Sequence, residues 1–123
     1  MSREDLLRLA EGGLAAYPPN KIADLVSSCR DLCRAIPDAR YCILADALKI
    51  VADWFEQRDG YGGVCTSSVT ELNGAFQRLP LIVDETEPGA AAAFASDLQA
   101  EVSLIVGRGE EQLNAIYRDN PPM

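Results

Sequence analysis

Residues 38–57 read DARYCILADALKIVADWFEQ, and this stretch decides the fold class. Its apolar residues recur every three or four positions along two adjacent stripes, which is the pattern of an α-helix packed on more than one side. The first stripe is Tyr41, Leu44, Leu48, Val51 and Phe55, and the second is Ile43, Ala47, Ile50 and Trp54. Asp38 is a favourable N-cap residue for this helix. We therefore expect a central helix with other helices around it.

The helical period continues on both sides of this segment. Apolar side chains recur at helical spacing in residues 3–16, 20–36, 68–79, 88–106 and 110–118. Asn20 and Ser68 are the expected N-cap residues of two of these helices. Gly107 and Gly109 predict a break before the last helix. The apolar positions Phe94, Ile116 and Tyr117 are expected to face the core.

The short apolar run Leu81, Ile82 and Val83 is ambiguous, because it fits a strand or one more helical turn. No second strand-like run exists to pair with it, so we expect a helix or an extended loop. The sequence as a whole predicts one all-α domain over residues 1–123, a compact bundle of five or six helices with roughly antiparallel neighbours. Residues 119–123 are expected to form a frayed tail.

The composition is that of a soluble globular chain, with 48% apolar and 24% charged residues among 123. The longest apolar runs, such as residues 89–95, fall far short of the roughly 20 residues of a membrane span. The first residues carry early acids and no apolar signal segment, so we expect a cytoplasmic location.

The net charge of −8 is unevenly distributed, with −2 in residues 1–61 and −6 in residues 62–123. The eleven Lys and Arg residues are scattered, which disfavours direct binding to nucleic acid and to anionic membranes. A protein partner, especially a basic one such as a nucleic-acid-binding protein, suits this charge better.

The acidic residues of the second half are concentrated where no base is present. Residues 79–107 contain no Lys or Arg and five carboxylates, namely Asp84, Glu85, Glu87, Asp97 and Glu101. Asp97 and Glu101 would project together from a helix, one turn apart. A row of such charges imitates a phosphate backbone, the strategy of small acidic inhibitors as a class. We expect these five residues, with Tyr61 in its glycine-rich loop, to contact the partner.

Catalytic and metal chemistry have little support in the residues present. The chain has no histidine, the commonest general base and metal ligand. Cys29 and Cys33 lie one turn apart in an apolar stripe and are expected to pack as reduced, small hydrophobic residues. A disulfide, or a zinc site completed by Cys42 and Cys65, is the alternative.

The sequence thus predicts a non-enzymatic acidic interaction protein without cofactor or metal. It would bind and block a basic macromolecule, as inhibitor, immunity or anti-CRISPR-type proteins do, and a homodimer is compatible with this function. A first alternative is an adaptor or secretion-type chaperone that binds its client in an apolar helix groove around Tyr61, Leu81, Ile82 and Val83. A second alternative is a helical protein with a cysteine-ligated metal.

Overall fold

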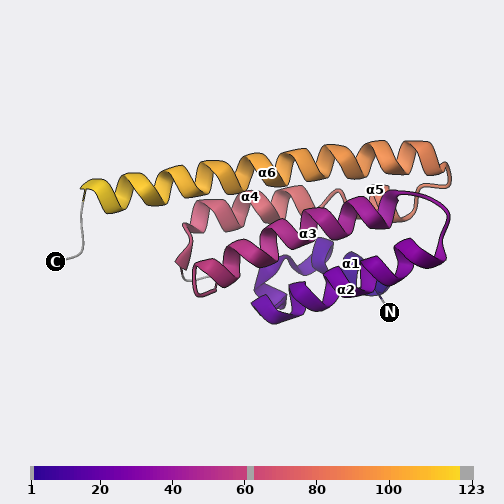
Figure 1. The fold of residues 1–123 in the computed structure, drawn as a ribbon, viewed down its shortest axis with the longest axis horizontal. Helices are drawn as coiled ribbons and strands as arrows, with labels where there is room; N and C mark the ends of the chain where they lie inside the picture. Colours follow the sequence, from indigo (N-terminus) through magenta and orange to yellow (C-terminus); the bar gives the residue numbers. More distant parts are fainter. Residues whose placement is uncertain (1, 61–62, 120–123) are drawn as a thin grey trace.

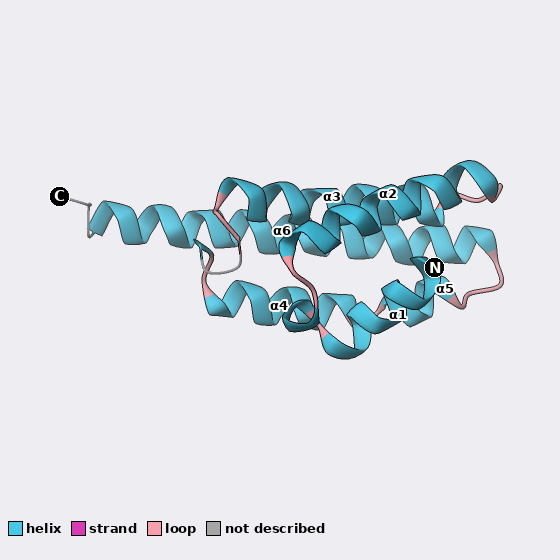
Figure 2. Cartoon of the chain, turned by 90° about the horizontal axis from the view of Figure 1, so that it is seen from below, coloured by secondary structure: helices cyan, strands magenta, loops and turns pink. Residues whose placement is uncertain are grey.

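The computed structural model describes residues 2–60 and 63–119, and every regular element in these ranges is helical (Figures 1 and 2). The elements in chain order are α1 (Ser2–Gly12), the 3-10 turn η1 (Leu14–Ala16), α2 (Pro19–Ala35), α3 (Arg40–Gln57), α4 (Thr66–Phe76), α5 (Leu79–Val83) and α6 (Pro88–Asp119). They pack as a compact bundle, so the expected all-α class is confirmed. Leu81, Ile82 and Val83 are helical.

Helix α3 is the centre of the bundle, because it packs against α2 on one side and α6 on another. Its first apolar stripe is fully buried, as are Ala47 and Trp54 of the second, while Ile43 and Ile50 are half-buried. The two-stripe pattern therefore predicted the role of this helix correctly. Helices α4 and α5 pack on α6, and α1 contacts α5 and α2.

Helix α6 runs without interruption through Gly107 and Gly109, so the predicted break is wrong. The cause is visible at Gly109, which is buried where α6 approaches α3 and α4. A Cβ atom at this position would lie 2.6 Å from Trp54 Cη2 and 2.9 Å from Ser68 Oγ. The glycine is thus required for close helix packing rather than for helix termination.

Three apolar residues of α6 predicted to be buried are exposed. Phe94 is 42% exposed because it lies beside the buried stripe of Ala91, Ala95, Leu98, Val102 and Ile105 rather than within it. Ile116 and Tyr117 are 48% and 50% exposed. They lie on the last turns of α6, after the buried Leu113, and Tyr117 lines a pocket with Gln57 and Arg58 at the end of α3.

Several helix boundaries differ from the predicted ones because backbone groups replace the expected caps. Helix α2 begins at Pro19, whose fixed φ suits the first helical position, and not after Asn20. Helix α4 begins at Thr66, since the carbonyl of Cys65 already accepts the Ser68 amide at 3.0 Å. Ser68 is consequently a buried helical residue and not a cap.

A buried arginine connects the start of α3 to the end of α5. Arg40 Nε donates to Asp38 Oδ1 at 3.2 Å, and both side chains are less than a tenth exposed. Arg40 Nη1 donates to the carbonyl oxygens of Ile82 (2.9 Å), Val83 (3.1 Å) and Glu85 (2.7 Å). The last carbonyls of a helix lack intrahelical donors, so Arg40 supplies the donors that α5 would otherwise miss.

Gly107 and Gly109, two of the glycines of α6, give a matched test of the helix packing. Gly109→Ala is expected to destabilise the protein by about 1–3 kcal/mol, because the methyl group would overlap Trp54. Gly107→Ala is expected to stabilise it by up to about 1 kcal/mol, because no atom lies within 4 Å and alanine is the better helix former. Urea denaturation of both variants measures the difference, and equal shifts would contradict the proposed role of Gly109.

Removal of the Arg40 side chain tests the connection between α3 and α5. We expect Arg40→Ala to lower the free energy of unfolding by about 3–5 kcal/mol, since it leaves Asp38 charged and buried and three carbonyls without their donor. Arg34→Ala is the control, because Arg34 forms only an exposed pair with Asp31. A loss at Arg40 as small as that of the control would show that the buried contacts contribute little.

Candidate functional site

The connection between α5 and α6 presents three of the predicted partner-binding residues, Asp84, Glu85 and Glu87, hereafter the acidic loop. Arg40 holds this loop through backbone carbonyls, including that of Glu85, and not through the three carboxylates. Asp84 forms an ion pair with Arg3 of α1. Glu85 Oε1 accepts the backbone amide of Glu87 at 3.1 Å. The described residues supply no cationic partner for Glu85 or Glu87.

The other two predicted residues, Asp97 and Glu101, lie one turn apart on α6 and are hereafter the acidic helix pair. Glu101 forms an ion pair with Arg78, the residue that precedes α5. Asp97 is exposed and has no ion pair within the described part of the chain. At 1.5 Å per residue the pair begins roughly 14 Å along α6 from Pro88. The five acids therefore extend from the loop before α6 into the first half of that helix, and they do not form one cluster.

Two of the five charges are balanced by arginines that the sequence analysis missed. Arg3 and Arg78 lie outside residues 79–107 in sequence, but the fold brings them to Asp84 and Glu101. The seven residues together keep a net charge of −3. All four paired side chains are at least a third exposed, and such pairs contribute only about 0–1 kcal/mol each. A stronger cationic partner can displace them.

The residues that were predicted to line an apolar groove around Leu81 do not all lie at the surface. Ile82 and Val83 belong to the buried core, and only Leu81 is exposed, at 65%. Tyr61, the remaining member of both predicted contact sets, lies outside the described residues. The exposed large apolar residues are instead mostly on α6, namely Phe94, Leu104, Ile116 and Tyr117.

Helix α6 is also more apolar as a whole than its short uninterrupted apolar runs, such as residues 89–95, indicated. Residues 88–118 are long and apolar enough, by length and composition, to cross a membrane, with a mean hydropathy of 1.2 over 18 residues. Of that window, 28% is buried inside the bundle. The buried share is the stripe that packs on α3, α4 and α5.

The cysteines do not all remain free, contrary to expectation. Cys33 and Cys42 form a disulfide across the α2–α3 connection, with their Cα atoms 5.1 Å apart. Cys29 is fully buried, and burial raises the pKa of its thiol to about 12, so it is protonated at neutral pH. Cys65 is half-buried at the start of α4. Within the described ranges no three His, Cys, Asp or Glu side chains are arranged to hold a metal ion.

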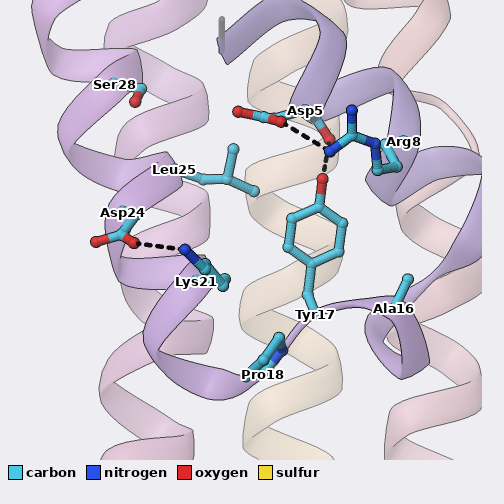
Figure 3. A pocket seen from close by; sticks show the side chains of 9 residues that line it. All are labelled: Asp5, Arg8, Ala16, Tyr17, Pro18, Lys21, Asp24, Leu25 and Ser28. Atoms are coloured by element: carbon cyan, nitrogen blue, oxygen red, sulfur yellow. Dashed lines mark hydrogen bonds and ion pairs between the residues drawn. The ribbon is translucent and has the colours of Figure 1, made fainter.

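A polar pocket of about 340 Å³ lies between α1, η1 and α2 (Figure 3). Its charges are balanced inside the pocket, because Arg8 pairs with Asp5 at 3.3 Å and Lys21 pairs with Asp24 at 3.8 Å. The hydroxyl of Tyr17 donates to the Asp5 carbonyl at 2.8 Å, and burial, more than the nearby Asp5 carboxylate, raises the pKa of this phenol. Because its two acids pair with its two bases, the pocket offers no net charge to a ligand.

The disulfide and the burial of Cys29 are tested by counting thiols. In denaturant without reductant we expect two reactive thiols, from Cys29 and Cys65, and four after reduction. In the native protein Cys65 should react first, because Cys29 is buried and protonated. Cys33→Ser is the control, since it should release Cys42 and give three thiols without reductant. Four thiols in the untreated protein would exclude the disulfide.

No protein-family model, no curated protein and no solved structure matches this chain.

Proposed function

We propose that this protein is a non-enzymatic interaction protein that binds and blocks a basic macromolecule, such as a nucleic-acid-binding protein, through the acidic loop and the acidic helix pair. The observation that carries the proposal is that Glu85, Glu87 and Asp97 are outside any ion pair among the described residues. A surface with unbalanced charge of one sign attracts an oppositely charged partner and accelerates its association.

The helix dipole accounts for part of this charge but not for all of it. Carboxylates near a helix N-terminus are stabilised by about 0.3–1 kcal/mol, which explains why Glu85 and Glu87 are tolerated before α6. The dipole effect fades within the first turn, so it does not extend to Asp97 and Glu101. Asp97 has neither the dipole nor an ion pair among the described residues to stabilise its charge, and this supports a role in binding.

The non-enzymatic part of the proposal rests on the residues available for chemistry. Without histidine, proton transfer at neutral pH would need a carboxyl, thiol or amine with a strongly shifted pKa. Cys29 is shifted in the unreactive direction. Two further cysteines are joined to each other, which removes both thiols as nucleophiles.

Charge removal at the proposed surface gives the decisive test. The site variant carries Glu85→Gln, Glu87→Gln and Asp97→Asn, and the matched control carries Glu11→Gln, Asp46→Asn and Glu111→Gln, three exposed acids elsewhere. The probe is a fluorescent peptide of ten lysines, whose affinity is measured by anisotropy at low and high salt. We expect the site variant to bind at least about fivefold more weakly than the control at low salt.

Salt should weaken the wild-type complex strongly, because the interaction is between exposed charges. If the site and control variants lose the same affinity, only the overall charge of −8 attracts the peptide, and the proposed surface has no special role.

A second candidate function, an adaptor or secretion-type chaperone, is favoured by the exposed apolar residues of α6. Leu104 is 66% exposed, and Phe94, Ile116 and Tyr117 are at least 42% exposed on the same helix. A client bound there would be retained at high salt and lost on Leu104→Gln, whereas the charge variant would leave it bound. This pattern would replace the electrostatic proposal.

A further inference from the structure

A groove of about 520 Å³ lies between the first turns of α2 and the last turns of α3. Its apolar lining comes from Pro19, Ala23, Ala52 and Phe55. Small side chains at positions 23 and 52 leave open the space that larger ones would fill between the two helices. The sequence analysis did not identify this feature, because the residues that form it are far apart along the chain.

The rim of the groove is acidic. Asp53, Glu56 and Asp59 line it, and no lysine or arginine does. Asp53 forms an exposed pair with Lys49 at 2.7 Å, whereas Glu56 and Asp59 have no ion pair in the described part of the chain. The nearby Arg58 points to Glu110, with Nε 2.9 Å from Oε2.

The ends of the two helices modify this charge only slightly. The C-terminus of α3 adds about half a negative charge and the N-terminus of α2 about half a positive one, so the dipoles nearly cancel. The two unpaired carboxylates remain, and the groove keeps a negative potential over an apolar floor.

The backbone at the end of α3 fixes the position of Asp59, which carries one of these carboxylates. Asp59 has φ 58° and Gly60 has φ 96°, both in the left-handed region. The Gly60 amide donates to the Phe55 carbonyl at 2.7 Å, which closes the helix in the usual αL manner. Asp59 is therefore held beside the groove by the helix terminus itself.

We propose that this groove binds a short basic and apolar peptide segment, in which an aliphatic side chain lies on the floor and an adjacent Arg or Lys pairs with Glu56 and Asp59. Charge complementarity selects this occupant over an acidic or purely apolar one. The site is separate from the acidic loop, since the two lie at opposite ends of α3, roughly 28 Å apart along the helix (Figure 1). It does not depend on the proposed function.

The test uses two probe peptides that differ in one residue, whose charge is reversed: acetyl-Gly-Leu-Arg-Leu-Gly-amide and acetyl-Gly-Leu-Glu-Leu-Gly-amide. Binding to the ¹⁵N-labelled full chain is followed by NMR shifts of the backbone amides. We expect the Arg peptide to bind with shifts centred on residues 20–24 and 52–60, and the Glu peptide to cause none. The double variant Glu56→Gln, Asp59→Asn should weaken the Arg peptide about fivefold to tenfold.

The variants are chosen so that the fold is retained. Asparagine tolerates the left-handed conformation of residue 59, and both substitutions keep the side-chain shape. Ala23→Leu fills the groove from an exposed helix position and should also reduce binding, without a change in charge. The control Asp46→Asn, Glu111→Gln removes two exposed acids elsewhere and should change the affinity by less than about twofold.

Three results would overturn the proposal: equal binding of the two peptides, unchanged affinity in the groove variants, or shifts centred on residues 84–101. The triple variant at the acidic loop and helix pair separates the two proposals. This variant should still bind the Arg peptide in the groove, whether or not it has lost affinity for the lysine peptide. Binding in the groove therefore tests this proposal even if the wild-type protein does not bind the lysine peptide at the acidic loop and helix pair.

Discussion

The buried contact between Arg40 and the end of α5 is the interaction on which the arrangement of the acidic residues depends. Its guanidinium joins the first turn of the central helix to three carbonyls at the point where the chain turns toward α6. Asp38 balances the charge, so the pair is buried together and the acids of the loop remain outside it. Loss of this side chain would remove three hydrogen bonds that hold the chain between α5 and the start of α6.

The sequence was sufficient to predict the helices but not the contacts between them. The double stripe of residues 41–55 predicted a helix packed on two sides, and α2 and α6 occupy those sides. The same reasoning failed at Gly109, because a glycine lowers helix propensity in any context while its actual role is set by Trp54 and Ser68 on other helices. Phe94 was misplaced because it lies beside the buried stripe of α6, and Ile116 and Tyr117 because helical spacing does not show where the buried part of a helix ends.

The sequence likewise showed which acids the candidate site contains, but it did not show which of them form ion pairs. The acids of residues 84–101 are exposed or half-exposed, yet Arg3 and Arg78 reach two of them from neighbouring elements. A disulfide was considered less favoured than packed, reduced thiols because Cys29 and Cys33 fall in an apolar stripe, and the pairing of Cys33 with Cys42 was not predicted. A signal was available, since Pro37 forces a short turn and places the end of one helix beside the start of the next. The groove at the other end of α3 could not be predicted from the sequence, because it is formed by the start of α2 and the end of α3 together.

The contact between Gly109 and Trp54 makes two distant positions in the chain a single steric unit. The indole at position 54, together with the hydroxyl of Ser68, leaves room only for a hydrogen atom at position 109, and a smaller ring or an aliphatic chain at position 54 would remove the nearer obstacle. Natural variants of this bundle should therefore change the two positions together, with bulk moving from one helix to the other while the distance between α3 and α6 is conserved.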